Sequence, residues 1–104
     1  MNGAPAATAP PPPPAGLSTV PRIADGLRLQ YETAQDCHVL LYPEGMVKLN
    51  RSAGEILTRC DGRRRVDEIV AELESAFEAQ GLSGDVLAFV DLARRQRWLV
   101  WDET

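Results

Sequence analysis

The pattern of apolar and polar residues, together with the turns between them, predicts three short strands between residues 27 and 49. Residues 27–33 alternate strictly, which is typical of a half-buried strand. Residues 37–42 are apolar and end at Pro43, which cannot donate to a central ladder. Residues 46–49 follow a Pro-Glu-Gly turn. We expect a three-stranded antiparallel meander, which is too small to be stable unless helices cover one face.

Helical periodicity predicts three helices after these strands. Asn50 or Ser52 can cap the first helix, and the second spans residues 66–80. Ser83 is expected to cap the third, which runs to about residue 97. This order predicts an α+β fold that is winged helix-turn-helix-like, with the three-stranded antiparallel sheet followed by the three helices.

The third predicted helix carries more apolar surface than a core-facing helix needs. Its apolar side chains sweep an arc of roughly 220°, against the roughly 100° typical of a surface helix. The short strand 46–49 is expected to leave one edge unpaired beside this helix, and such an edge suits the addition of an extended peptide. Alternatively, the second helix and a strand or extended tail at 98–101 cover the third helix on both sides.

The first 21 residues have a composition of their own. They hold seven of the eight prolines and no charged side chain, so they cannot build a core. We therefore expect a disordered Pro/Ala-rich linker at 1–21 and a folded domain at 22–104. A ligand for a proline-recognising domain is the alternative, although no charged residue is present there to anchor it.

Charge and composition disfavour several classes of function. The net charge is −4, which suits non-specific nucleic-acid binding poorly. One histidine and two cysteines without ligand spacing predict no metal, no cofactor and no catalytic residue. No stretch approaches the roughly 20 apolar residues of a membrane span, and no secretory signal is evident. We expect a cytoplasmic, non-enzymatic protein.

The middle of the chain resembles the PqqD family of pyrroloquinoline quinone (PQQ) biosynthesis, and the resemblance covers about residues 21–101. The matching parts are the Tyr-Pro-Glu-Gly turn at 42–45, the pair Leu49-Asn50, the helix start Ser52-Ala53 and the stop Cys60-Asp61-Gly62. The resemblance implies a peptide chaperone that binds a ribosomally made precursor peptide. It also implies that this chaperone presents the peptide to a radical S-adenosylmethionine (SAM) enzyme carrying iron-sulfur clusters. The family also occurs fused behind another enzyme of the pathway, which would explain the proline-rich start as a former tether between domains.

The resemblance further implies where the peptide binds. In related recognition domains the leader peptide adds as a strand beside the third strand and lies against the third helix. Carried over to this chain, the contacts fall on Met46, Val47, Lys48 and Leu49 of the strand and on Val86, Phe89, Val90 and Ala93 of the helix. Which of the helical positions face the groove stays open.

The order of elements alone leaves a second function open, a winged-helix DNA-binding regulator. Such a regulator needs base-reading side chains on its recognition helix. Here Asp85 stands at the start of the third helix, and Arg94, Arg95 and Arg97 stand at its end. These arginines are most often a solvated face, with capture of an acidic partner as the functional alternative. The same two interpretations apply to the arginines at 63–65, to which no function is assigned.

Overall fold

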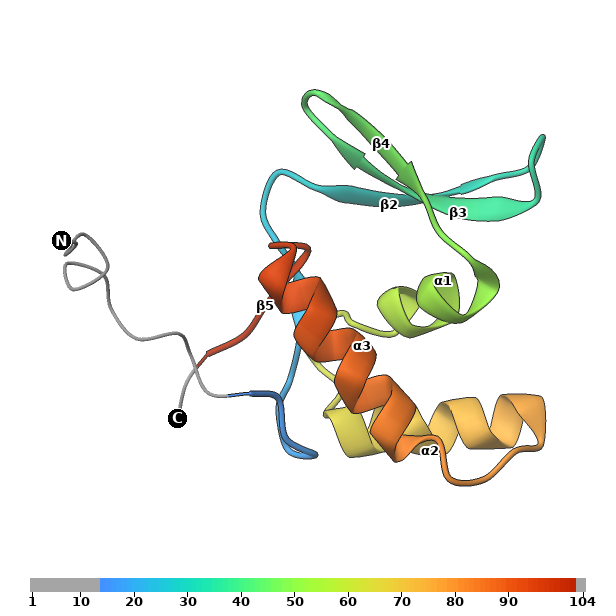
Figure 1. The fold of residues 1–104 in the computed structure, drawn as a ribbon, viewed down its shortest axis with the longest axis vertical. Helices are drawn as coiled ribbons and strands as arrows, with labels where there is room; N and C mark the ends of the chain where they lie inside the picture. The colour runs from blue at the N-terminus through green and yellow to red at the C-terminus, as the bar shows by residue number, and fades with distance from the viewer. Residues whose placement is uncertain (1–13, 103–104) are drawn as a thin grey trace, which may run out of the picture.

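The computed structural model describes residues 14–102, and the part of the expected linker at 1–13 lies outside it. Within the described part the sheet of strands precedes three helices, as predicted, so the α+β, winged-helix-like architecture is confirmed. Figure 1 shows the sheet at one end of the molecule, with α1 below it. The elements are β1 (Arg22–Ile23), β2 (Arg28–Glu32), β3 (Cys37–Tyr42), β4 (Gly45–Lys48), α1 (Arg51–Thr58), α2 (Val66–Phe77), α3 (Ser83–Arg95) and β5 (Leu99–Val100).

The main sheet is an antiparallel meander with β3 at its centre, in the order β2-β3-β4. Leu40 of β3 pairs with Leu29 of β2 on one side and with Val47 of β4 on the other. Because side chains alternate between the faces of a sheet, these three share one face. Leu40 is fully buried in the cluster that the helices form, so this face rests on the helices.

The start of α1 follows the predicted capping chemistry. The Asn50 side-chain oxygen accepts a hydrogen bond from the amide of Ala53 at 2.8 Å. This bond satisfies one of the amides left free in the first turn of a helix. Of the two candidate caps, Asn50 is therefore the one used.

The other helix ends differ from the prediction. Glu78 ends α2 in a left-handed conformation with φ 52°, before the expected stop at Gly81. Ser83 is the first residue of α3 and not its cap, since Leu82 occupies the cap position without a side-chain bond. The expected cap was therefore wrong. The backbone amide of Leu82 is instead bonded to the Glu74 carboxylate at 3.0 Å, a contact that only the packing of α2 beside this loop provides.

A second, two-stranded sheet joins the two ends of the domain. Strand β5 pairs antiparallel with β1, with Leu99 opposite Ile23 and Val100 opposite Arg22. Leu99 is fully buried. The stretch 98–101 was expected as a short strand or a tail, and its partner was not foreseen because two residues are too short for any periodicity.

Residues 15–21, here called the N-terminal strap, differ from the expected linker. The Thr19 carbonyl accepts a hydrogen bond from the amide of Val66 at 2.8 Å, and the Leu17 carbonyl accepts one from Asp67 at 2.9 Å. Pro21 is fully buried. The strap thereby satisfies the free amides at the start of α2. Within the described residues, contacts with the folded domain therefore begin before the expected boundary at residue 21.

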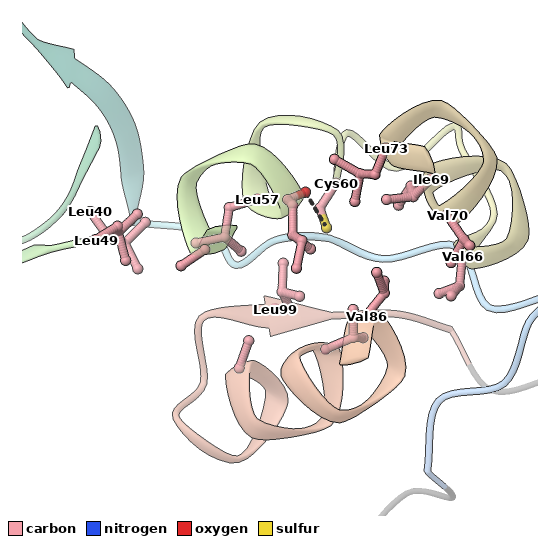
Figure 2. Packing of buried hydrophobic residues seen from close by; sticks show 14 residues of the cluster. Leu40, Leu49, Leu57, Cys60, Val66, Ile69, Val70, Leu73, Val86 and Leu99 are labelled. Atoms are coloured by element: carbon pink, nitrogen blue, oxygen red, sulfur yellow. Dashed lines mark hydrogen bonds between the residues drawn. The ribbon is translucent and has the colours of Figure 1, made fainter. Parts of the chain in front are cut away.

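The core runs through every layer of the domain (Figure 2). Leu40 and Leu49 enter it from the sheet, and Leu99 enters it from β5. The Cys60 thiol donates to the Ile56 carbonyl at 3.2 Å within this cluster. Its remaining members come from the helices and their ends: Ala53, Ile56, Leu57, Val66, Ile69, Val70, Leu73, Val86, Val90 and Ala93.

The basic run at 63–65 lies in the turn between α1 and α2. Arg64 bonds the carboxylates of Asp61 and Glu72, each at 2.9 Å. Arg65 pairs with Asp67 at 2.6 Å. These partly exposed pairs each add little stability. They account for two of the three arginines as local contacts of the turn.

Candidate peptide-binding groove

Strand β4 forms an edge of the sheet in the described part of the chain, since its partner there is β3 alone. The Leu49 amide donates to the His38 carbonyl at 3.0 Å, which places Leu49 in a hydrogen-bonded pair with β3. In an antiparallel ladder the direction of the main-chain groups alternates from residue to residue. Val47 therefore directs its N–H and C=O toward β3. Met46 and Lys48 direct theirs toward the open edge.

The exposure of the side chains along this strand alternates in the same way. Met46 is 52% exposed, and Lys48 is also exposed. Val47 is half-buried against the core, and Leu49 is a core residue. The four strand residues expected to contact a peptide thus have two roles. Met46 and Lys48 offer accessible groups, whereas Val47 and Leu49 hold the strand on the domain.

Most of the α3 side chains that were expected to contact a peptide are buried. Val86, Val90 and Ala93 are buried, at 2%, 0% and 0% exposure, so their side chains belong to the core. Phe89 is half-buried, and Leu92 is 41% exposed. Leu92 was not among the expected contacts, although it lies at one edge of the apolar arc noted in the sequence. Phe89 and Leu92, three residues apart, form the apolar flank of α3 that stays accessible.

A cleft of about 340 Å³ lies beside the start of this flank. Asp85 and Val86 of α3 line it together with residues of α1 and α2. The Arg51 guanidinium lies 5.1 Å from the centre of the Phe77 ring at its rim. Phe89 stands one helical turn beyond Asp85, so the accessible flank of α3 continues from this cleft.

The sheet edge and the cleft are connected through α1. Two residues separate the end of β4 from the start of α1, whose first residues line the cleft. Figure 1 shows α1 below the sheet and above α2. The domain thus offers main-chain groups on β4 and accessible apolar surface on α3, with α1 following the one in sequence and lining the cleft beside the other.

His38 and Cys60, which could serve in catalysis or metal binding, have structural contacts instead. The His38 ring lies 5.1 Å from that of Tyr31, and its Nε2 is 3.3 Å from the Thr58 hydroxyl oxygen. Burial, reinforced by the charge of Asp61, raises the pKa of Cys60 from 9.0 to about 12, so its thiol stays protonated. Among residues 14–102, no group of three His, Cys, Asp or Glu side chains is arranged to hold a metal ion. No helix in this range is long and apolar enough to cross a membrane.

Known proteins match the chain over most of its length. The family model described as Coenzyme PQQ synthesis protein D (PqqD) matches residues 37–99. A PqqA binding protein of Pseudomonas aeruginosa (strain UCBPP-PA14) is 58% identical over 84 residues, which cover 80% of this chain and 91% of that protein. A PqqA binding protein of Klebsiella pneumoniae is 51% identical over 79 residues, which cover 75% of this chain and 86% of that protein.

A solved structure matches as well. It is the NMR structure of the PqqD truncation of Methylobacterium extorquens PqqCD, described as a functional and stand-alone recognition element for ribosomally synthesized and post-translationally modified peptides. The TM-score is 0.71 and the sequence identity 31%, over 83% of this chain and 94% of that one. The family match extends from β3 to β5 and so includes both β4 and α3. This chain belongs to the PqqD family.

Proposed function

We propose that this protein is a non-enzymatic peptide chaperone of PQQ biosynthesis that binds a ribosomally made precursor peptide as an added strand beside β4. The observation that carries the proposal is the open edge of β4. There Met46 and Lys48 direct their main-chain groups away from β3, as deduced from the bond between Leu49 and His38. An extended peptide satisfies these groups without depending on its side chains.

The energetics of the edge suit a short peptide. Met46 and Lys48 together offer two donors and two acceptors, and each bond contributes about 0.5–1.5 kcal/mol net. The accessible apolar flank, Phe89 and Leu92, adds a surface on which peptide side chains are removed from water. Val86, Val90 and Ala93 lie beneath this flank and hold α3 in place.

The relatives support the identity of the peptide. Those from Pseudomonas and Klebsiella are named for binding PqqA, and we extend this ligand to the present chain. The family resemblance further suggests delivery of the bound peptide to a radical SAM enzyme with iron-sulfur clusters. The solved relative is a truncation of the longer PqqCD, which supports a tethering role for the proline-rich residues before the strap.

Titration of the ¹⁵N-labelled protein with the PqqA peptide tests the binding site. We expect the largest amide shifts in residues 45–49 and 85–92. Shifts confined to the β1–β5 sheet would contradict the groove. Incubation of the labelled protein with random duplex DNA tests the alternative of a DNA-binding regulator, for which binding weakens steeply as the salt concentration rises.

A second assay tests the chaperone role. The purified radical SAM enzyme is incubated with PqqA in the presence and absence of this protein, and the modified peptide is measured by mass spectrometry. We expect modification to require the protein, and no modification of the peptide by the protein alone. Equal modification in its absence would refute the role.

A further inference from the structure

A second surface lies at the end of α3, on the side of the helix away from Leu92. Arg94, Arg97 and Trp101 line a cleft there of about 410 Å³. Leu92 and Arg94 are two residues apart on a helix, which places them roughly 200° apart around its axis. This surface, here called the arginine cleft, is therefore separate from the accessible apolar flank of α3.

Within residues 14–102, Arg94 lies in the arginine cleft without an acidic partner. Its guanidinium lies 5.9 Å from the centre of the Trp101 ring, a distance that allows a cation–π contact. Its Nε atom is buried and has no hydrogen-bond partner within residues 14–102. A buried donor without a partner destabilises a fold. A carboxylate that binds this guanidinium side-on, accepting from Nε and from one Nη group, would supply the missing acceptor.

Arg97 occupies a backbone conformation that favours glycine. Its φ is 67°, and it follows the end of α3, where its amide donates to the Arg94 carbonyl at 2.9 Å. Left-handed geometry is unfavourable for a residue with a Cβ atom, so glycine is the usual choice just past a helix end. An arginine here, lining the same cleft as Arg94, indicates a role for its side chain beyond closing the helix.

The charges of the arginine cleft favour an anionic ligand. Among the described residues, Asp25 is the one acidic residue that lines it, against two guanidinium groups. Neither Arg94 nor Arg97 forms an ion pair within the described residues. Guanidinium groups bind carboxylates with two parallel hydrogen bonds, and arginine and tryptophan are enriched at protein interfaces. The net charge of −4 disfavours a polyphosphate chain as the ligand.

We propose that the arginine cleft docks an acidic segment of a protein partner, with a partner Asp or Glu carboxylate bound by Arg94 and Arg97 beside Trp101. The β4 edge and the accessible apolar flank of α3 then stay free. In combination with the proposed function, α3 separates a peptide-binding flank from a partner-binding flank, so the precursor peptide and a protein partner bind at the same time.

The test uses acetyl-tetraglutamate amide as the probe and acetyl-tetraglutamine amide as its neutral control. The full-length protein is titrated with each, and the indole N–H resonance of Trp101 is followed by NMR. We expect a saturable shift with tetraglutamate alone. The double variant Arg94→Gln/Arg97→Gln should weaken binding at least tenfold, whereas Arg63→Gln, at an exposed arginine outside the cleft, should leave it unchanged.

The variant Arg97→Gly separates binding from folding. Glycine relieves the left-handed strain, so the thermal midpoint should stay equal or rise while tetraglutamate binding falls. Three results would overturn the proposal: no shift of Trp101, equal shifts with tetraglutamine, or unchanged binding in the double variant. Saturation by random duplex DNA at lower concentration than by tetraglutamate would also overturn it, in favour of a nucleic acid. Because no probe is the precursor peptide, the outcome is independent of the proposed function.

Discussion

The amide of Leu49 donates to the carbonyl of His38 at 3.0 Å, just after β4 ends. From this one bond the direction of each main-chain group along the strand can be deduced, because the direction alternates in an antiparallel pair. Val47 therefore bonds inward to β3, and Lys48 directs its amide to the open edge. Two neighbouring residues of one short strand thus have opposite main-chain directions, one toward the fold and one toward the edge at which we propose that the peptide binds.

Proline at these two positions is predicted to have opposite effects, since proline has no amide proton to donate. Lys48→Pro should leave the circular dichroism spectrum intact and weaken PqqA binding by about 1 kcal/mol or more, roughly fivefold. Val47→Pro should disrupt the sheet. Lys48→Ala is the matched control, because it removes the ammonium group and keeps the amide. A folded Val47→Pro variant with normal affinity would show that the bonding alternation is wrong.

Substitutions in α3 are predicted to separate the accessible flank from the core. Leu92→Ala, at a side chain 41% exposed, should change the unfolding free energy by less than about 1 kcal/mol and weaken PqqA binding. Val90→Ala, at a fully buried side chain, should cost about 2 kcal/mol of stability. Urea unfolding and calorimetric titration measure the two quantities. Equal loss of affinity in the two folded variants would contradict the assignment of the flank.

Gly54 is predicted to be required for the contact between α1 and β3. A Cβ atom at this position would lie 2.6 Å from Nδ1 of His38. Gly54→Ala should therefore destabilise the domain by about 1–3 kcal/mol, although alanine favours helices. Gly84→Ala is the control, since a Cβ there has no neighbour within 4 Å, and it should be neutral or stabilising. His38→Ala should restore most of the stability lost in Gly54→Ala.

Truncation is predicted to distinguish the strap from the residues before it. Removal of residues 1–13 should leave the melting temperature unchanged, given their composition. Removal of residues 1–20 deletes the carbonyls of Leu17 and Thr19 that bond the start of α2. The melting temperature should then fall, by roughly 4–8 °C for each kcal/mol lost. Equal melting temperatures for both truncations would show that the strap adds no stability.

The Cys60 thiol predicts a loss of stability at alkaline pH. Burial raises the pKa of this thiol from 9.0 to about 12 in the folded state, so between these values the unfolded state releases a proton that the folded state keeps. The free energy of unfolding is therefore unaffected by this group below pH 9. It should decrease by up to about 1.4 kcal/mol per pH unit above it. Cys60→Ala should remove this part of the dependence, measured by urea unfolding at pH 8 to 10.

Much of the architecture was determined by local sequence. Alternating residues define β2, an apolar run that ends at Pro43 defines β3, and Asn50, one of the two expected caps, caps α1. These features follow from side chains within one strand or one helical turn, so they are visible without the fold. The turn motif and helix stop between residues 42 and 62 also indicated the family, which the matches to known proteins confirm.

The tertiary structure alone decided which residues are accessible. The apolar arc of α3 did not reveal that Val90 packs inward while Leu92 faces solvent, because that choice depends on the neighbouring elements. Likewise, residues 15–21 have no periodic pattern, and the pairing of their carbonyls with α2 arises only when distant segments meet. The pairing of β1 with β5 and the arginine cleft beside it have the same origin. Contacts between segments far apart in the chain leave no periodic signal in either segment.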